Sequence, residues 1–305
     1  MDVLVTGSSS GFGELTVKAL ASAGHRVFAS MRNVESRNAP AAQMLREWAR
    51  RHSADLDVVE LDVLSEGSSG AAIDFILGRT GGRIDVVVNN AGASASGPIE
   101  AFTMEQIEGL FSLNAFGPLR VCKAVLPAMR AQGSGLIIFI TSTLGRVLPG
   151  RGGLYPATKW AEEGLAESLC YQVRPFGIDV AIVEPGAFPT PAHGKVMLAA
   201  DSEIEAAYAA VAPPAAPPRP DPPIGHREPD PSEVADAVKQ IIALPAGQRP
   251  LRTVVGPVFT EGVAEYNSVY DRTRAHLAEV LRRPDQAITW SAPSAASKVR
   301  PLSTS

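Results

Sequence analysis

Short, continuous runs of β-branched and aliphatic residues recur along the chain, separated by longer stretches with a different pattern. The runs lie at residues 3–5, 26–29, 56–61, 84–88, 136–140, 178–183 and 252–255. A run without polar alternation is typical of a strand that is buried on both faces of a sheet. The stretches between the runs repeat apolar residues at helical spacing, as Leu15, Ala19 and Ala23 do. The pattern therefore predicts strands that alternate with helices.

This alternation predicts an α/β fold in which helices cover both faces of a parallel sheet. It continues from residue 2 to about residue 256, so we expect a single domain over residues 1–283. Residues 284–305 are rich in Ser, Ala and Pro and poor in large apolar residues. That composition predicts a disordered tail.

One internal segment interrupts the alternation, because prolines crowd residues 212–231 and exclude a regular helix or a central strand. It belongs to a longer expected loop over residues 187–230. Two interpretations stay open for this loop. It is either a mobile surface segment or a lid beside a substrate cleft.

Composition and charge narrow the classes of function. The 28 basic and 32 acidic residues are spread along the chain, without a basic block that would follow a nucleic-acid backbone. The first strand begins almost at once, and the longest apolar runs, such as 136–140, are too short to span a bilayer. We therefore expect a soluble, cytoplasmic protein whose partners include neither nucleic acid nor membrane.

The two cysteines, Cys122 and Cys170, lie far apart in stretches with a helical pattern. Their separation matches neither a metal-binding spacing nor a disulfide framework. We expect reduced, structural thiols and no metal site.

A glycine-rich turn follows the first predicted strand, with the sequence Thr6-Gly7-Ser8-Ser9-Ser10-Gly11-Phe12-Gly13 before a helix that begins near Glu14. Backbone N–H groups of such a turn can approach a pyrophosphate, whose charge also gains from the helix N-terminus. Gly7 permits a tight turn, and Gly11 and Gly13 permit close approach of cofactor and helix. Taken alone, this spacing of glycines is also compatible with a turn that has only a structural role. The place of the turn after the first strand favours a dinucleotide site.

Selectivity between NAD and NADP depends on the end of the second predicted strand, where NAD-selective proteins place a carboxylate against the adenosine ribose. Ser30 occupies that place, and Arg32 lies two residues further on. A guanidinium can bind a 2′-phosphate as a forked donor, so Arg32 predicts a preference for NADP(H), with NAD(H) also possible. The alternative is that Arg32 is an ordinary solvated arginine. After the third strand, Asp62 is a candidate either to bind the adenine amino group or to cap a helix.

Four polar residues further along the chain carry candidate chemistry. Tyr155 and Lys159 are four residues apart at the start of a predicted helix, which puts them on one face. A nearby ammonium favours the phenolate, so Lys159 could bring Tyr155 into use as an acid or base. Ser142 follows the strand at 136–140 and could hydrogen-bond the reacting oxygen. Asn114 lies in an apolar helical stretch and needs a partner, for example a water connected to Lys159.

In order and spacing, these motifs resemble those of the short-chain dehydrogenases/reductases. The matching elements, within residues 2 to 256, are Thr6-Gly7-x3-Gly11-x-Gly13, Asn89-Asn90-Ala91-Gly92, Asn114, Ser142, Tyr155-x3-Lys159 and Pro185-Gly186-x3-Thr190. The resemblance implies a doubly wound, seven-stranded Rossmann sheet, and Arg32 looks like the NADP-preferring branch. It implies a catalytic tetrad of Asn114, Ser142, Tyr155 and Lys159.

The resemblance also implies roles in cofactor binding. Lys159 would hold the nicotinamide ribose, Asn90 would help to fix the cofactor, and Thr190 would orient the nicotinamide amide. The expected cofactor-binding residues are Gly7, Ser9, Ser10, Gly11, Phe12, Gly13, Arg32, Asp62, Val63, Asn90, Ala91, Gly92, Tyr155, Lys159, Pro185, Gly186, Phe188 and Thr190. Copies of the chain would pair through helices at 112–132 and 155–174, as a homodimer or homotetramer.

The predicted activity is an NADP(H)-dependent interconversion of a carbonyl and a secondary alcohol, in which Tyr155 transfers the proton. An epimerase or dehydratase that uses the cofactor transiently is one alternative, and a non-catalytic dinucleotide sensor is another. The substrate is expected to be a small molecule.

The substrate pocket is expected within residues 93–98, 143–150 and 187–225, which follow three of the predicted strands. Basic side chains in or next to these segments could meet an acidic substrate, with surface or structural roles as the alternative. They are Arg146, Arg151 and His193.

Overall fold

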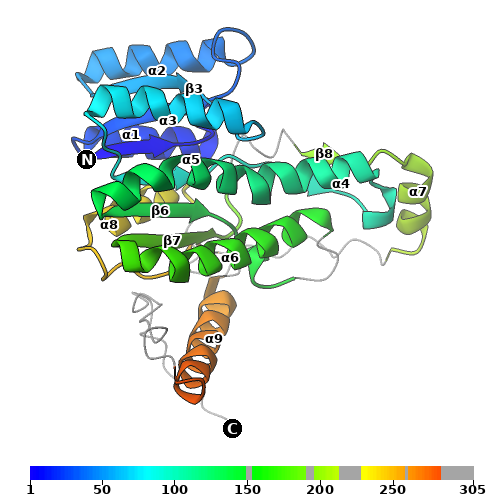
Figure 1. Cartoon of the computed structure of the whole chain (residues 1–305). Coiled ribbons are helices and arrows are strands. Elements are labelled where there is room, and N and C mark those ends of the chain that lie inside the picture. Colours follow the sequence, from blue (N-terminus) through cyan, green and yellow to red (C-terminus); the bar gives the residue numbers. More distant parts are fainter. Residues whose placement is uncertain (149–152, 190–195, 213–227, 258–259, 283–305) are drawn as a thin grey trace.

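The computed structural model describes residues 1–148, 153–189, 196–212, 228–257 and 260–282. Its centre is a seven-stranded parallel sheet in the order β3-β2-β1-β4-β6-β7-β9 (Figure 1). The strands are β1 (Asp2–Val5), β2 (Arg26–Met31), β3 (Leu56–Glu60), β4 (Val86–Asn89), β6 (Gly135–Ile140), β7 (Ile178–Pro185) and β9 (Arg252–Val255). Each run that was expected to be a strand overlaps one of these, and the predicted α/β fold is confirmed.

Helices cover both faces of the sheet (Figure 1). One face carries α1 (Gly11–Ser22), α2 (Ala39–His52) and α8 (Ser232–Ala243), and the other carries α3 (Glu66–Thr80), α5 (Gly117–Gln132) and α6 (Leu154–Val173). Alternate residues of β1 meet the two faces, because Val3 and Val5 join the first buried cluster and Leu4 joins the second. This two-sided burial explains why the strands lack polar alternation.

The parallel register brings the carboxyl ends of the strands to one edge of the sheet. Val5 of β1 lies opposite Val88 of β4, and Asn89 lies opposite Phe139 of β6. After β3 at the outer edge, the chain returns to lay β4 on the other side of β1, so the direction of winding reverses between β1 and β4. Open α/β sheets bind their ligands at such a reversal.

A smaller layer lies beyond that edge, on the right in Figure 1. It contains α4 (Met104–Phe111), α7 (Ser202–Ala210) and a parallel pair of two-residue strands, β5 (Ala95–Ser96) and β8 (Met197–Leu198). Phe102, Leu110 and Leu154 form a buried apolar cluster here. The pair was not expected from the sequence, because two-residue strands leave no hydrophobic pattern to detect.

The last helix, α9 (Thr260–Val280), extends away from the sheet in Figure 1. Its first half is anchored by Val263 and Asn267, which are buried. No helix within the described ranges is long and apolar enough to cross a bilayer. The expected tail at 284–305 and most of the proline-rich segment lie outside the described residues, so the single domain over 1–283 stays a prediction.

Both cysteines are buried free thiols in helices, as the pattern indicated, with Cys122 in α5 and Cys170 in α6. Burial raises the pKa of Cys122 to about 12 and that of Cys170 to about 11. Both thiols therefore stay protonated near neutral pH, which agrees with a structural role.

Two glycines allow a paired test of the packing. Gly177, after the turn η4 (Arg174–Phe176), has a φ of +73°, and a Cβ there would overlap the carbonyl oxygen of Gly133. We expect Gly177→Ala to lower the free energy of unfolding by about 1–3 kcal/mol, through backbone strain and overpacking. Gly164 lies in α6, where a Cβ would meet nothing within 4 Å, so Gly164→Ala should raise it by about 0.5–1 kcal/mol.

Urea denaturation of the two variants and the unmodified chain measures both changes. A Gly177→Ala variant as stable as the unmodified chain would contradict the steric argument.

Candidate active site

Thr6, directly after β1, joins the glycine-rich turn to the loop that follows β4. Its Oγ1 accepts hydrogen bonds from the backbone N–H groups of Asn90 at 3.0 Å and Ala91 at 3.1 Å. The Asn90 side chain also bonds to this segment, because its Nδ2 donates to the carbonyls of Thr6 at 2.8 Å and Gly7 at 3.2 Å. Thr6 is buried and was not among the expected site residues, although it stood within the matched motif. Asn90 therefore holds the turn itself.

The glycines of this turn are required by close packing. Gly7 has a φ of +70°, and a Cβ there would lie 2.8 Å from the Cα of Ala91. A Cβ at Gly13 would overlap the carbonyl oxygen of Gly7 and lie 2.6 Å from Nδ2 of Asn90. Gly13 is thus needed for a contact inside the protein, whereas the sequence predicts that it permits close approach of the cofactor and the helix. The helix also starts earlier than expected, at Gly11, which has a φ of +61°.

The donors that this turn offers suit an anion. The carbonyl oxygens of Thr6 and Gly7 are taken up by Asn90. The first N–H groups of a helix have no acceptor within the helix, and α1 begins directly after the turn. Backbone N–H groups next to a helix N-terminus match a pyrophosphate, so these residues fit a nicotinamide dinucleotide. Ser9, Ser10 and Phe12 lie in the same half-buried segment.

At the end of β2, the position of Ser30 differs from the one expected. Ser30 lies inside the strand, wholly buried, and its Oγ donates to a β1 carbonyl at 3.2 Å, so it is not exposed at the strand end. Arg32 is exposed immediately after the strand, and no ion pair within the described residues involves it. Glu60 at the end of β3 fixes the loop after Arg32, because its carboxylate accepts from the N–H groups of Asn33 at 2.7 Å and Val34 at 2.8 Å.

Asp62 is half-buried after β3 and makes a local turn. Its Oδ1 accepts from the N–H of Leu64 at 3.0 Å. The helix-capping alternative for Asp62 is wrong, because Ser65 is the N-cap of α3 and accepts from the N–H of Ser68 at 3.1 Å. The neighbouring Val63 is buried, and its side chain packs where α5 begins.

Tyr155 and Lys159 lie in the first turns of α6 and face each other, with the Lys159 Nζ 5.9 Å from the centre of the phenol ring. Lys159 is only 4% exposed, while Tyr155 is half-buried. The ammonium donates to the carbonyl of Ile140 at 3.0 Å and to the Oε2 of Glu162 at 2.7 Å. Burial alone would lower the pKa of Lys159, but the charges of Glu162, Tyr155 and Glu163 raise it, so the ammonium stays charged.

Asn114 is completely buried in η2 (Ser112–Phe116), a π-helical turn between α4 and α5. Its Oδ1 accepts from the N–H of Ala93 at 2.9 Å, and its Nδ2 donates to the Ala93 carbonyl and to Oγ1 of Thr158, each at 2.9 Å. Thr158 in turn donates to the Tyr155 carbonyl at 2.7 Å. Asn114 therefore bonds to other protein groups and not to the water that was expected as its partner. A Cβ on Gly92 would lie 3.2 Å from Asn114 Oδ1 and 3.8 Å from Lys159 Nζ, so these groups are neighbours.

Ser142 follows β6 and is 8% exposed. Its Oγ accepts from the N–H of Leu144 at 3.1 Å and thereby caps the short turn η3 (Thr143–Gly145). A Cβ on Gly145 would lie 3.1 Å from the backbone oxygen of Lys159, so this turn rests directly on α6. The structure thus gathers Asn114, Ser142 and the Tyr155–Lys159 pair around the start of α6.

The loop after β7 contacts β9 and the start of α1. The N–H of Gly186, which follows Pro185, donates to the β9 carbonyl of Val255 at 2.8 Å. Phe188 is buried and meets Phe12 edge to face, with the ring centres 5.6 Å apart. Two expected cofactor residues therefore contact each other. Thr190 lies outside the described residues.

Arg146 belongs to the interior. It is buried, its Nε donates to Oδ1 of Asn267 at 2.8 Å, and its guanidinium lies 4.7 Å from the Tyr270 ring centre and 4.8 Å from that of Tyr266. The structural alternative for Arg146 is confirmed, because these contacts occupy the side chain. Arg151 and His193 lie outside the described residues.

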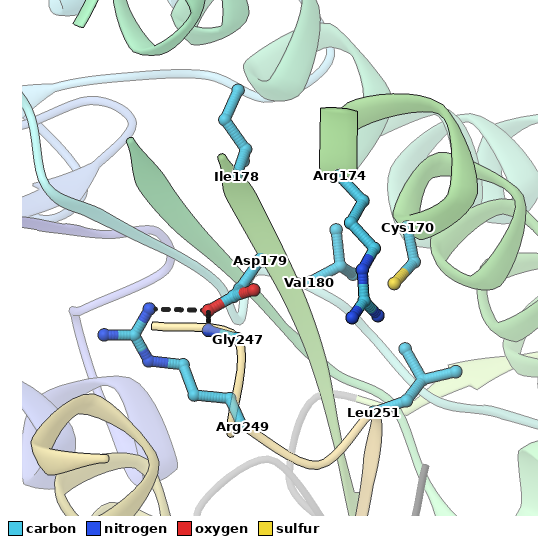
Figure 2. A pocket seen from close by; sticks show the side chains of 8 residues that line it. All are labelled: Cys170, Arg174, Ile178, Asp179, Val180, Gly247, Arg249 and Leu251. Atoms are coloured by element: carbon cyan, nitrogen blue, oxygen red, sulfur yellow. Dashed lines mark hydrogen bonds and ion pairs between the residues drawn. The ribbon is translucent and has the colours of Figure 1, made fainter. Parts of the chain in front are cut away.

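Figure 2 shows a hollow at the opposite edge of the sheet. Its wall includes Ile178 and Asp179 at the start of β7, and Arg249 pairs with Asp179 there at 2.9 Å. Cys170, near the far end of α6, and Arg174, in the turn η4 that follows this helix, also line the hollow (Figure 2). Tyr155 and Lys159 lie at the other end of that helix, so this hollow is not their substrate pocket. The described residues contain no cluster of three His, Cys, Asp or Glu suited to a metal.

The family model for short chain dehydrogenases matches residues 2–200. The chain belongs to the short-chain dehydrogenase family. It is 38% identical over 188 residues to a 3-ketodihydrosphingosine reductase of Bacteroides thetaiotaomicron, covering 62% of this chain and 64% of the relative. It is 36% identical over 201 residues to human retinol dehydrogenase 8, covering 64% of this chain and 61% of that protein. These alignments span less than two thirds of either relative.

Solved structures of the family match over more of the chain. A short-chain dehydrogenase from Streptomyces avermitilis has a TM-score of 0.71 at 32% identity and covers 93% of this chain and 98% of its own. A single-residue variant of the actinorhodin polyketide ketoreductase, solved with NADPH, has a TM-score of 0.69 at 27% identity and covers 85% and 97%. The family members therefore share the sheet and its helices.

Asn114 offers a test of how this site is held together. Asn114→Ala would leave the N–H and carbonyl of Ala93 without their buried partner. We expect a loss of about 1–3 kcal/mol in the free energy of unfolding. Thr158→Ser keeps the hydroxyl that bonds to Asn114 and to the Tyr155 carbonyl, so it should cost less. Urea denaturation of both variants provides the measurement, and an Asn114→Ala chain as stable as Thr158→Ser would contradict the argument.

Proposed function

We propose that this short-chain dehydrogenase is an NADP(H)-dependent oxidoreductase that interconverts a carbonyl and a secondary alcohol, with Tyr155 as general acid and base. The observation that carries the proposal is the buried ammonium of Lys159 facing the Tyr155 ring, 5.9 Å from its centre. A positive charge in a poorly solvated position favours ionisation of a nearby phenol. Asn114 and Ser142 pack around the same turn of helix, which supports a shared role.

When bound, the cofactor supplies a hydride from its nicotinamide C4 to the carbonyl carbon. Tyr155 donates its phenolic proton to the carbonyl oxygen, which completes the new hydroxyl. Ser142 stabilises that oxygen: its Oγ already accepts from Leu144, so its own hydrogen remains available to donate. The Tyr155 phenolate is stabilised by Lys159 and then takes a proton from solvent. Oxidation of the alcohol follows the same steps in reverse.

The turn between Gly7 and Gly13 would hold the pyrophosphate, and Arg32 would bind the 2′-phosphate of NADP(H) as a forked donor. Two neighbours support the nucleotide, since a Thermococcus sibiricus alcohol dehydrogenase was solved with 5-hydroxy-NADP and the actinorhodin ketoreductase with NADPH. NAD(H) is the alternative cofactor. The expected contacts of Asp62, Asn90 and Phe188 with the cofactor belong to the same proposal.

For the substrate we infer an apolar carbonyl or alcohol. Leu154, which precedes Tyr155 in the chain, belongs to the buried apolar cluster with Phe102 and Leu110, so the start of α6 lies in apolar surroundings. The relatives include a 3-ketodihydrosphingosine reductase and retinol dehydrogenases.

A homodimer or homotetramer through η2, α5 and α6 is part of the proposal, supported by the exposed Phe116 and Trp160.

The role of Tyr155 is tested by Tyr155→Phe, which keeps the ring and removes the proton. We expect turnover to fall by about 10²- to 10⁴-fold, with NADPH affinity unchanged. Reduction of a panel containing 3-ketodihydrosphingosine and retinal is followed by the loss of NADPH absorbance. Tyr171→Phe, further along α6, is the matched control and should keep its activity. Undiminished turnover in Tyr155→Phe would refute the assignment, and product formation without net NADPH consumption would indicate an epimerase or dehydratase.

Cofactor preference is tested by Arg32→Asp. The change removes a forked donor and introduces a charge that repels the 2′-phosphate, so the ratio of NADPH to NADH affinity should fall about 10- to 100-fold. Arg272→Asp on α9 makes the same change of charge elsewhere and should leave the ratio unaltered. Fluorescence titration with both nucleotides provides the measurement. An unchanged ratio in Arg32→Asp would mean that Arg32 is only a solvated arginine.

A further inference from the structure

Glu162 is a buried carboxylate less than one helical turn after Lys159. Its side chain is 2% exposed, and its Oε2 lies 2.7 Å from the Lys159 Nζ. Buried ion pairs are often no more stabilising than apolar side chains of the same volume, because both charges lose their hydration. The carboxylate therefore calls for a reason other than stability.

The geometry of the ammonium supplies that reason. A lysine ammonium has three N–H donors. One donates to the carbonyl of Ile140 at 3.0 Å, and one donates to Glu162. A single donor is left for the side of the site where Tyr155 lies. Glu162 thus influences both where the ammonium is held and how much of its charge acts on the phenol.

We propose that Glu162 is a positioning residue, whose carboxylate holds the Lys159 ammonium in the interior and limits the positive charge that acts on Tyr155. This inference rests on the proposed function of the Tyr155–Lys159 pair. An anion beside the cation opposes its field, and the effect is strong in a poorly solvated interior. While Glu162 is ionised, its negative charge offsets part of the field that the Lys159 ammonium exerts at the Tyr155 phenol.

Of the groups described around Glu162, Glu162 itself is the one that changes charge near neutral pH. From α5, Cys122 interacts with it electrostatically, but burial raises the pKa of this thiol to about 12 and keeps it neutral. From β4, Asn89 is an uncharged amide whose Nδ2 donates to the Cys122 sulfur at 3.7 Å. On α6 itself, Glu163 is already paired with an arginine of β9 at 2.9 Å. Within the described residues, Lys159 is the cation that pairs with Glu162.

Burial raises the pKa of Glu162 to about 7, although the charge of Lys159 and its hydrogen bond act to lower this pKa. The carboxyl is therefore neutral below that pH and ionised above it. As the pH rises through this range, the growing negative charge weakens the effect of Lys159 on Tyr155.

The test is the ionisation of Tyr155 in the cofactor-free protein, followed by tyrosinate absorbance. Subtracting the titration of the matching Tyr155→Phe variant isolates this one phenol. Glu162→Gln keeps the size of the side chain and removes the charge, so the pKa of Tyr155 should fall by about one unit. Glu162→Leu should lower it likewise and covers the case in which the glutamine variant does not fold.

The matched control is Glu167→Gln, which removes another buried carboxylate of α6 that pairs with Arg252 at 2.7 Å. Its Tyr155 should ionise as in the unmodified chain. An unchanged Tyr155 pKa in both Glu162 variants would overturn the proposal, and so would an equal shift in Glu167→Gln. This readout needs no substrate, so a chain that reduces no carbonyl would refute the proposed function without deciding the role of Glu162. With an active alcohol substrate, the rise of kcat/KM with pH should shift down in Glu162→Gln by the same amount.

Discussion

The parallel pairing of β1, β4 and β6 is the constraint on which the site depends, because it delivers three loop starts to one edge of the sheet. Backbone hydrogen bonds alone would leave these loops free to diverge. Thr6 and Asn90 prevent this by exchanging hydrogen bonds across the boundary between β1 and β4. These hydrogen bonds therefore hold two segments together as one unit. The first is the turn that offers N–H groups to an anion, and the second is the loop that passes beside Lys159.

A second set of contacts ties this edge to the helices. Asn114 joins the loop after β4 to the start of α6, and the turn capped by Ser142 rests on the same helix. Behind them, charged side chains fill the space between α6, β7, β9 and α9. Arg252 binds Glu163 and Glu167, and burial raises the pKa of Glu184 to about 8. Buried charges cost hydration, so each needs its partner in a defined position, which makes α9 part of the support behind the site.

The strands and the glycine-rich turn could be predicted because their signals are local. Continuous aliphatic runs identify buried strands, and a glycine motif after the first of them predicts a tight turn that leads into a helix. The partners of individual side chains could not be predicted. Asn114 contacts Ala93 and Thr158, 21 and 44 residues away, and Arg146 contacts Asn267, 121 residues away. No local pattern encodes such pairs, so a water was expected for Asn114 and an acidic substrate was considered for Arg146.

The sequence by itself determined the class of fold, the order of strands and helices, and which residues carry polar chemistry at strand ends. Those properties follow from hydrophobic periodicity and from residue types at fixed spacing. Only the tertiary structure decided that Gly13 serves packing, that Ser65 and not Asp62 caps α3, and that Glu162 binds the Lys159 ammonium. The physical reason is that burial and distance set the strength of a charge or a hydrogen bond, and both arise only when distant segments are brought together.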